Sequence, residues 1–469
     1  MAAPRGSSVD EGGRQADDRF VPGESAVRPN GNATPQERKS PPLADFIESL
    51  DDYLRVAPER YFSRERMELE WERLWTRTWL CAGRVSDLPA KGSWFRYDIG
   101  RESFVIVRED EHRIAAFYNV CQHRGNRLVD ADFGRNTTFV CPYHSWSYDR
   151  GGRCIHVTDR GMFRPAALAG SLDIPTVRCE QFGGFVFICI NGNTQPLSAH
   201  LGEMADIVQG YRMERMEVRS DASLDLACNW KLMLDAFSEV YHAHITHPGA
   251  AAIIEDRRIQ TDFYANGHTR RIVPVGEPSG RLGRQAVLNA SQRFLLAEAG
   301  LDPEVHTGNV RLAVQQAKRA MTGPRAQVYS TLSDNQLTDD WAINIFANIH
   351  WSLHAEGMLL LTYNPHPSDP NQCRLGISVL AHPGIPFDLY YMPDAKEHEP
   401  SGRPRRVRLR HDDPDLAAVI GHLLFEDIRN TRETQQGIQS RGFGGVRLSE
   451  QEQALMHQNA EMDRLLFQL

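Results

Sequence analysis

The sequence contains no apolar run long enough to cross a membrane. Its longest apolar stretches, such as Gly184 to Ile190, have the length of one β-strand, whereas a spanning helix needs about 18 residues. It also has no excess of basic residues, because 53 Lys and Arg face 61 Asp and Glu and the net charge is −8. This balance argues against nucleic-acid binding. The N-terminus lacks the basic-then-apolar pattern of a secretory signal, so we expect a cytoplasmic protein that binds neither nucleic acid nor membrane.

Cysteine is sparse, with eight residues in a chain of 469. That number is too low for a disulfide scaffold in a chain of this length. A reduced protein that nevertheless places Cys and His close together in the sequence more often binds a metal.

The texture of the sequence changes along the chain. Residues 1–42 are rich in Gly, Ser, Pro, Arg and Asp, which predicts a disordered tail. Residues 43–80 repeat apolar side chains every three to four positions and predict helices. Residues 81–193 hold short alternating runs between turns, which predicts a compact all-β module. Residues 194–469 mix helical and strand patterns and form the remaining, larger part.

Within the larger part, residues 229–247 predict one helical segment, and long helices are expected from Asp415 and from Ser449. Strands are expected near 332–362 and at 374–381. Residues 257–325 have only weak periodicity and receive no assignment. A stretch of this kind often covers the active site of an enzyme.

The strongest motif consists of two short loops that each carry one cysteine and one histidine. Cys121 and His123 form the first pair, and Cys141 and His144 form the second. A structural zinc site is the simplest alternative, but such sites usually place the two cysteines together and the two histidines together. A 2Fe–2S cluster of the Rieske type needs two cysteines on one iron and two histidines on the other. The division of ligands between the loops favours this cluster.

A second group of metal-binding side chains follows. Glu239, His242, His244 and His247 lie within nine residues, and two histidines with one carboxylate form the ligand set of many non-haem iron enzymes. On a regular helix His244 and His247 would share a face about 60° apart, whereas His242 and His247 would differ by about 140°. Pro248 disfavours helix at the preceding residue. Spacing alone therefore leaves the ligand pair open.

Together, these motifs resemble the large (alpha) catalytic subunit of Rieske non-haem iron aromatic-ring-hydroxylating oxygenases. The resemblance covers about Tyr61 to the C-terminus, apart from residues 257–325, and includes the spacing Glu239, His242, His247. It implies that His242 and His247 bind iron and that His244 does not. It also implies that Asp427, at the start of the family's closing helix, supplies the third ligand, with Glu426 as the alternative.

The resemblance assigns further roles. Glu239 would bridge the iron and the cluster of a neighbouring subunit, at a position where Asp is usual and where Glu occurs in relatives that oxidise quaternary amines, though not only in those. Arg124 and Trp146 would lie beside the cluster. Ser145 stands where Gly is common, a departure that we expect to be harmless. Asp235 and Ala236 replace Glu and Asn, so any role of that Asn is absent.

The fold implied is α+β, with an all-β Rieske domain inserted in a catalytic domain whose antiparallel sheet is covered by helices (a helix-grip, START-like fold). NAD(P)H electrons would pass through a reductase, with or without a ferredoxin, to the cluster and on to Fe(II). The iron would use O2 to mono- or dioxygenate an aromatic or other apolar ring, as in aromatic hydrocarbon catabolism. Such enzymes have a homotrimeric core, and a small beta subunit would be a separate chain.

Several alternatives stay open from sequence. The enzyme could oxidise a quaternary amine or remove an N- or O-methyl group, and the chain could instead be a non-catalytic Rieske electron carrier or a zinc-stabilised scaffold. Apolar residues that could line a substrate site are equally suited to a core. These are Leu234, Phe237, Phe346, Ile349, Trp351, Leu353 and Met358.

Overall fold

The computed structural model describes residues 51–192, 194–283, 287–387, 392–399 and 402–467. The tail predicted at 1–42 and the apolar repeat up to residue 50 lie outside the described residues. Among the residues described, strands form sheets of seven, eight, three and two strands. No helix in these ranges combines the length and the apolar character required to cross a membrane.

The first part of the described chain is an antiparallel β module. Its seven-stranded sheet has the order β2-β11-β10-β5-β4-β3-β6. The strands β7, β8 and β9, which lie between β6 and β10 in the sequence, form a separate three-stranded sheet. The predicted all-β texture is therefore confirmed. The strands are β2 (Leu80–Arg84), β3 (Ser93–Ile99), β4 (Glu102–Arg108), β5 (Ile114–Tyr118), β6 (Phe133–Arg135), β7 (Phe139–Val140), β8 (Ser147–Tyr148), β9 (Cys154–His156), β10 (Thr176–Phe182) and β11 (Phe185–Cys189).

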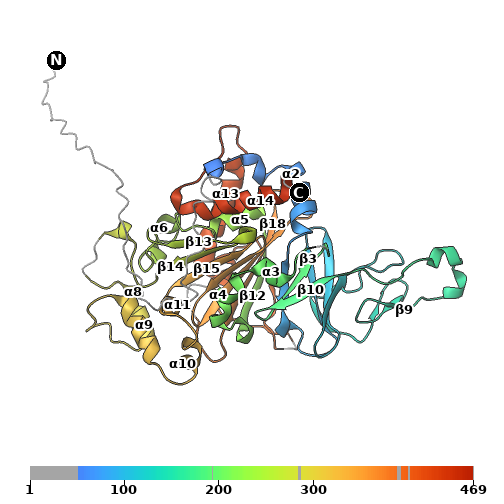
Figure 1. Cartoon of the computed structure of the whole chain (residues 1–469), viewed down its shortest axis with the longest axis horizontal. Helices are drawn as coiled ribbons and strands as arrows, with labels where there is room; N and C mark the ends of the chain where they lie inside the picture. Colours follow the sequence, from blue (N-terminus) through green and yellow to red (C-terminus); the bar gives the residue numbers. More distant parts are fainter. Residues whose placement is uncertain (1–50, 193, 284–286, 388–391, 400–401, 468–469) are drawn as a thin grey trace, which may run out of the picture. The chain divides into compact units, whose positions relative to one another are not determined.

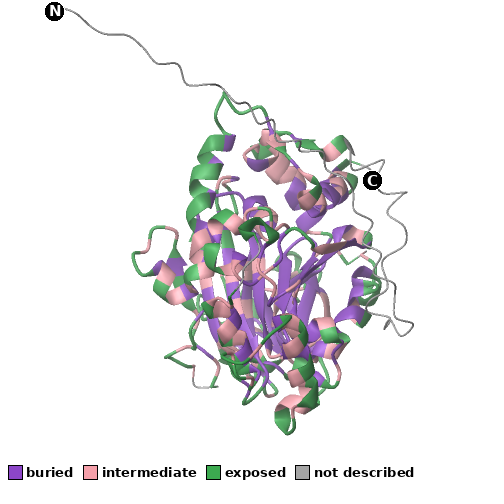
Figure 2. Ribbon diagram, turned by 90° about the vertical axis from the view of Figure 1, so that its left-hand side faces the viewer, coloured by how far each residue is buried: buried purple, intermediate pink, exposed green. Residues whose placement is uncertain are grey.

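The second part is built on an eight-stranded sheet of order β13-β14-β15-β16-β17-β18-β12-β19. Neighbouring strands are antiparallel except β12 and β19, which are parallel. The central strands are buried on both faces (Figure 2), so helices and the β module must cover the sheet. The strands are β12 (Glu217–Leu226), β13 (Gln260–Phe263), β14 (Thr269–Val273), β15 (Asp340–Ile345), β16 (Ile349–Leu353), β17 (Gly357–Pro365), β18 (Cys373–Ala381) and β19 (Val407–Arg410).

Helices α5, α13 and α14 lie together along one side of this sheet (Figure 1). The arrangement confirms the expected α+β fold, with an antiparallel sheet covered by helices. The helices are α2 (Arg64–Glu70), α3 (Leu197–Leu201), α4 (Met204–Val208), α5 (Trp230–Ala236), α6 (Ala243–Thr246), α7 (Pro248–Ala251), α8 (Ala290–Glu298), α9 (Val310–Ala320), α10 (Pro324–Tyr329), α11 (Asp334–Thr338), α12 (Leu416–Ile420), α13 (His422–Ile438) and α14 (Gln453–Phe467).

The segment before the β module packs against elements that follow it. Strand β1 (Arg55–Val56) pairs with β20 (Val446–Arg447). Glu70, only 2% exposed, accepts hydrogen bonds from Trp230 Nε1 at 3.1 Å and from Lys231 Nζ at 2.7 Å. The β module is thus an insertion between two segments of the larger part, as expected.

Several predicted elements differ from the structure. The helix expected over 229–247 is wrong, because α5 ends at Ala236 and α6 begins only at Ala243. The helix expected from Asp415 is interrupted at Gly421, whose φ of +85° ends α12 before α13 begins. Residues 334–338 are helical, so the strand region starts at Asp340. The unassigned stretch 257–325 contributes β13 and β14 to the large sheet, followed by α8 and α9.

Candidate metal centre

The break after α5 creates the loop that carries the metal-binding residues. Ser238 is fully buried, its Oγ lies 2.6 Å from the carbonyl oxygen of Leu234, and it accepts a hydrogen bond from Asn344 Nδ2 at 2.9 Å. A serine hydroxyl that bonds the previous helical turn competes with continuation of the helix. The chain resumes as α6 directly after His242, and Pro248 follows His247. The two histidines therefore flank one short helix instead of sharing the face of a long one.

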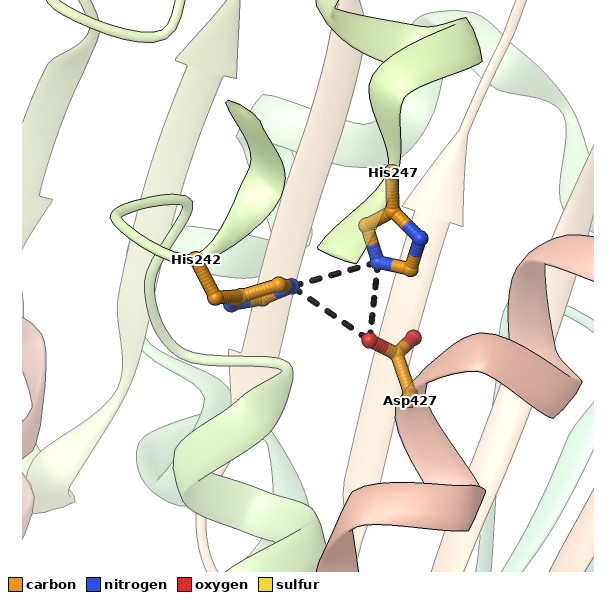
Figure 3. Close-up of side chains that lie close together, drawn as sticks. All are labelled: His242, His247 and Asp427. Carbon is orange, nitrogen blue, oxygen red and sulfur yellow. Dashed lines mark hydrogen bonds and ion pairs between the residues drawn. The ribbon is translucent and has the colours of Figure 1, made fainter. Parts of the chain in front are cut away.

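His242, His247 and Asp427 converge on one point (Figure 3). His247 Nε2 lies 2.8 Å from Asp427 Oδ1, His242 Nε2 lies 3.3 Å from the same oxygen, and the two Nε2 atoms are 3.3 Å apart. His244 points elsewhere, with its Nδ1 3.0 Å from the carbonyl oxygen of Tyr241. The geometry thus brings together the two histidines and the aspartate that the resemblance selected.

Each histidine of the triad is held by a second carboxylate through its other ring nitrogen. Glu239 bonds His242 Nδ1 and also accepts the backbone N–H of His242 at 3.1 Å. Glu426 Oε2 lies 2.8 Å from His247 Nδ1. A carboxylate at Nδ1 fixes the proton there and leaves Nε2 as the free donor atom toward a metal. Glu426, the alternative ligand from sequence, instead orients His247.

The electrostatics of the triad suit a cation. Burial lowers the pKa of His242, but hydrogen bonds to Asp427 and Glu239 outweigh burial and raise that pKa to about 10. Burial raises the pKa of Asp427, yet the two histidines hold it below its usual value. A proton on His242 thus occupies a position surrounded by carboxylates. Two imidazole nitrogens and one carboxylate oxygen, with the fourth side open, fit a non-haem Fe(II) ion.

The two cysteine–histidine loops, residues 121–126 and 141–146, share one backbone geometry. In the first loop Gly125 N donates to Cys121 O at 2.9 Å, and in the second Ser145 N donates to Cys141 O at 2.9 Å. Both Gly125 (φ +76°) and Ser145 (φ +61°) are left-handed. Each turn begins at its cysteine, and the histidine follows two residues later in the first loop and three residues later in the second.

The donor atoms of these loops fit a Rieske cluster. The rings of His123 and His144 are 4.5 Å apart between centroids, and Cys121 and Cys141 are buried and form no disulfide. His123 Nδ1 is buried without a hydrogen-bond partner, which is costly for a polar atom unless it binds something. Two irons bridged by sulfide would accept two thiolates and two imidazoles here.

Two family models match the two parts of the chain that carry these residues. A family model described as the catalytic domain of the ring hydroxylating alpha subunit matches residues 213–467, more than half of the chain. The chain belongs to this family. A second model, the Rieske 2Fe–2S domain, matches residues 78–167. The catalytic-domain match also runs through residues 257–325, so their exclusion from the resemblance was wrong.

The curated relatives of this chain differ in the substrates that their names give. The glycine betaine monooxygenase oxygenase subunit of Pseudomonas aeruginosa is 29% identical over 215 residues, which cover 46% of this chain and 49% of the relative. The biphenyl 2,3-dioxygenase subunit alpha of Rhodococcus jostii is 30% identical over 210 residues, 43% and 45% of the two chains. The chain thus spans about half the length of the curated relatives it matches.

Solved structures of two oxygenases share the fold over most of the chain. A quaternary ammonium Rieske monooxygenase in complex with L-carnitine has a TM-score of 0.59 and 17% identity, covering 87% of this chain and 95% of that one. Naphthalene 1,2-dioxygenase from Rhodococcus sp. bound to indole has a TM-score of 0.61 and 16% identity, covering 90% and 97%.

In this alpha subunit residues of the triad border two cavities. All three border the first, the triad cavity, which has a volume of about 130 Å³ and a mainly apolar wall. The second, larger cavity has a volume of about 560 Å³. His242, Asp427 and Glu239 border both cavities. The apolar residues of the first are Ala236, Phe237, Val240, Ala243, Ala250, Ile253, Ile254, Val273, Val275, Ala342, Leu359 and Leu423.

Only Phe237, of the seven apolar residues considered from sequence, borders the triad cavity. The others are buried in the cores of the chain, so the core interpretation is correct for them.

Burial raises the pKa of Asp235 to about 7, and Tyr61 donates a hydrogen bond to its carboxylate at 2.7 Å.

Around the cluster loops, Trp146 stacks on the ring of His123 with centroids 5.0 Å apart. Arg124 contacts the ring of Tyr143, a residue of the second cluster loop, with its guanidinium carbon 5.3 Å from the ring centroid. Tyr148 was not predicted from the sequence, yet its hydroxyl lies 3.3 Å from Cys121 Sγ and accepts a hydrogen bond from Gln122 N at 2.9 Å. The spacing of the cysteine–histidine pairs gives no signal for Tyr148, because this residue follows the second loop and is not one of the four cluster ligands.

Arg271, a buried residue of β14 that borders the triad cavity, was not predicted from the sequence either. It falls in the stretch that received no secondary-structure assignment, so nothing in the sequence pattern pointed to it.

Proposed function

We propose that this chain is the terminal oxygenase component of a Rieske non-haem iron system that hydroxylates an apolar ring with O2. The observation that carries the proposal is the triad of His242, His247 and Asp427 at the wall of a mainly apolar cavity. Three protein ligands leave positions on an iron for O2 while a substrate occupies the cavity.

The chain's own residues prepare this chemistry. A bound Fe(II) would supply reductive activation of O2, and a bound 2Fe–2S cluster would supply the electrons. Glu239 and Glu426 hold the two imidazoles in the orientation that a metal needs. The apolar wall of the cavity excludes water and positions the ring beside the triad.

Electron delivery across a subunit boundary fits the arrangement of the residues. Within the described parts of the chain, no residue of the two cysteine–histidine loops borders either cavity beside the triad. Glu239 and His242 also border the larger cavity. We infer that the cluster of a neighbouring subunit approaches there in a homotrimer, with Glu239 as the bridge.

Further partners follow from this role. The electrons would come from NAD(P)H through a reductase, with or without a ferredoxin, in the cytoplasm where thiols stay reduced. A small beta subunit is compatible with the proposal.

Metal analysis and one substitution test the function. The purified protein should contain about three irons per chain together with acid-labile sulfide, whereas a Rieske electron carrier would contain about two. His242→Ala should abolish turnover and leave the visible spectrum of the cluster intact. His244→Ala is the matched control and should retain both. Turnover with labelled O2 should place the label in the product, and wild-type rates in the His242 variant would refute the ligand assignment.

Oxidation of a quaternary amine is the second proposed function. Glu239 in place of the usual Asp and the similarity to glycine betaine monooxygenase oxygenase subunits favour it. A quaternary ammonium group is usually held by several aromatic side chains, but Phe237 is the only Phe, Tyr or Trp among the described residues that border the triad cavity. Parallel turnover assays with one-ring compounds and with glycine betaine discriminate the two functions.

A further inference from the structure

A buried histidine of the large sheet has an unused ring nitrogen and borders the triad cavity. His350 of β16 is 2% exposed and lies in the wall of this cavity. Its Nδ1 lies 2.9 Å from Oδ1 of Asn344, the residue that is paired with it across β15 and β16. Its Nε2 forms no hydrogen bond within the described parts of the chain, yet it keeps accessible surface, unlike Nε and Nη1 of Arg271. A ligand in the cavity can therefore reach His350 Nε2.

The contacts of Asn344 determine which nitrogen of His350 carries the proton. The hydroxyl of Ser238 has one proton, and the carbonyl oxygen of Leu234 accepts it at 2.6 Å. Ser238 Oγ can therefore only accept from Asn344, which places the amide nitrogen Nδ2 on that side, at 2.9 Å. The amide oxygen of Asn344 then faces His350 and accepts a hydrogen bond from its Nδ1–H.

The second ring nitrogen, His350 Nε2, is consequently a hydrogen-bond acceptor. Burial and the nearby positive charge of Arg271 hold the pKa of His350 well below its usual value, so the ring is neutral. A neutral imidazole has one N–H, and in His350 that proton is on Nδ1. A buried acceptor that stays unpaired costs free energy. A ligand that brings an O–H or N–H group to Nε2 removes this cost.

The cavity limits the size of such a ligand. An engineered apolar cavity of about 150 Å³ in another protein binds benzene, so the volume of about 130 Å³ here suits one ring. The ring of Phe237 borders the same cavity, and its centroid lies 5.4 Å from that of His350. An apolar contact surface and the acceptor nitrogen are therefore close together.

We propose that His350 is a specificity-determining residue of this site and that the substrate is a one-ring compound whose hydroxyl or N–H group donates to Nε2. The substrate class rests on the proposed function. A quaternary ammonium group has no N–H and cannot form this hydrogen bond.

Ligand binding without turnover tests this assignment. Phenol and toluene have similar shapes, and only phenol carries a hydrogen-bond donor. Each is titrated calorimetrically into the purified holoprotein without reductant, and the ratio of the two dissociation constants measures the preference for the donor. His350→Leu should reduce this preference about three- to tenfold, the effect of one hydrogen bond. His350→Gln, which returns an acceptor oxygen, should restore part of the preference.

Two controls show whether the preference depends on His350. His244→Leu makes the same change at a histidine that borders neither of the two cavities beside the triad, and it should leave the preference unchanged. Removing the mononuclear metal with a chelator should also leave it unchanged, because the imidazole and not the metal binds the hydroxyl. Loss of the preference in either control overturns the assignment.

The tautomer of His350 gives a readout that does not depend on ligand affinity. Nitrogen NMR spectra of protein with isotope-labelled histidine should show His350 with a protonated Nδ1 and an unprotonated Nε2. The resonances are assigned by their loss in His350→Gln, and the Nε2 resonance should shift with phenol and not with toluene. A proton on Nε2 overturns the proposal even if His350→Leu fails to fold.

The remaining outcomes are equally decisive. An unchanged preference in His350→Leu, or binding of neither ligand to the wild type, overturns the role of His350. If phenol binds through His350 but labelled O2 never enters a product, the proposed function fails and the acceptor site stands. If wild type and His350→Leu oxygenate phenol and toluene with the same ratio of kcat/KM, the acceptor site fails and the oxygenase function stands.

Discussion

Replacing Glu426 by Gln tests how strongly the second carboxylate stabilises the metal site. The Glu426 side chain is 15% exposed, and its Oε2 lies 2.8 Å from His247 Nδ1. The substitution keeps an acceptor oxygen but removes the negative charge that holds the ring proton. Loss of such a partner typically costs about 10–100-fold in metal affinity, which corresponds to about 1.4–2.7 kcal/mol.

The assay is an anaerobic titration of metal-free protein with Fe(II) against a coloured competing chelator. Glu433→Gln, an exposed carboxylate on the same helix α13, is the matched control and should bind as wild type. Asp427→Asn should weaken binding more than Glu426→Gln, since Asp427 contributes a donor atom itself. An unchanged dissociation constant in Glu426→Gln would refute the orienting role, and a loss larger than that in Asp427→Asn would make Glu426 the ligand.

Three further predictions concern other parts of the chain. Ser145→Gly should stabilise the protein by about 1 kcal/mol in thermal unfolding and leave the cluster spectrum unchanged. Ser145 has a left-handed backbone, with φ +61°, which glycine adopts at lower cost. A lower thermal midpoint in the variant would contradict this prediction. Metal binding to the triad should tighten by up to tenfold for each unit of rising pH between about pH 6 and 9. The pKa of His242 is about 10 without metal, so its proton must leave when the metal binds. Calorimetry in buffers of different ionisation enthalpy measures the released proton, and an affinity that does not change with pH would contradict the prediction. Lys231→Ala should destabilise the protein in urea unfolding by up to about 3–5 kcal/mol, because buried Glu70 then keeps only the more distant Arg66, 3.5 Å away, as a charged partner. Lys318→Ala, at a pair with more exposed side chains, should cost less.

The metal-binding residues were accessible from sequence because their spacing is local. The paired loops at 121–126 and 141–146 carry all four cluster donors, and nine residues hold Glu239, His242 and His247. The role of Glu426 was not accessible in the same way. Adjacent carboxylates on a helix point in different directions, and only the folded structure shows that Glu426 meets His247 Nδ1 while Asp427 meets its Nε2.

The cavity wall was predicted poorly for a related reason. On β16 the apolar residues Ile349, Trp351 and Leu353 were considered as lining, yet the alternating set on the other face, His350 and Ser352, borders the triad cavity. The apolar and polar residues of β16 alternate, but both faces of the strand are buried, so the alternation does not show which face borders a cavity. Arg271 was missed because its strand was recognisable only through its pairing with β15.

The pairing of β1 with β20 has a consequence for synthesis on the ribosome. The seven-stranded sheet is complete once Cys189 has emerged, whereas β1 must wait for Val446, roughly 260 residues later. At about 5–20 residues per second, that interval lasts roughly 13–50 seconds. During it the cluster-binding loops can fold and acquire iron while the catalytic half of the nascent chain is still unfinished. The order of translation therefore allows the electron-carrying site to mature before the oxygen-activating one.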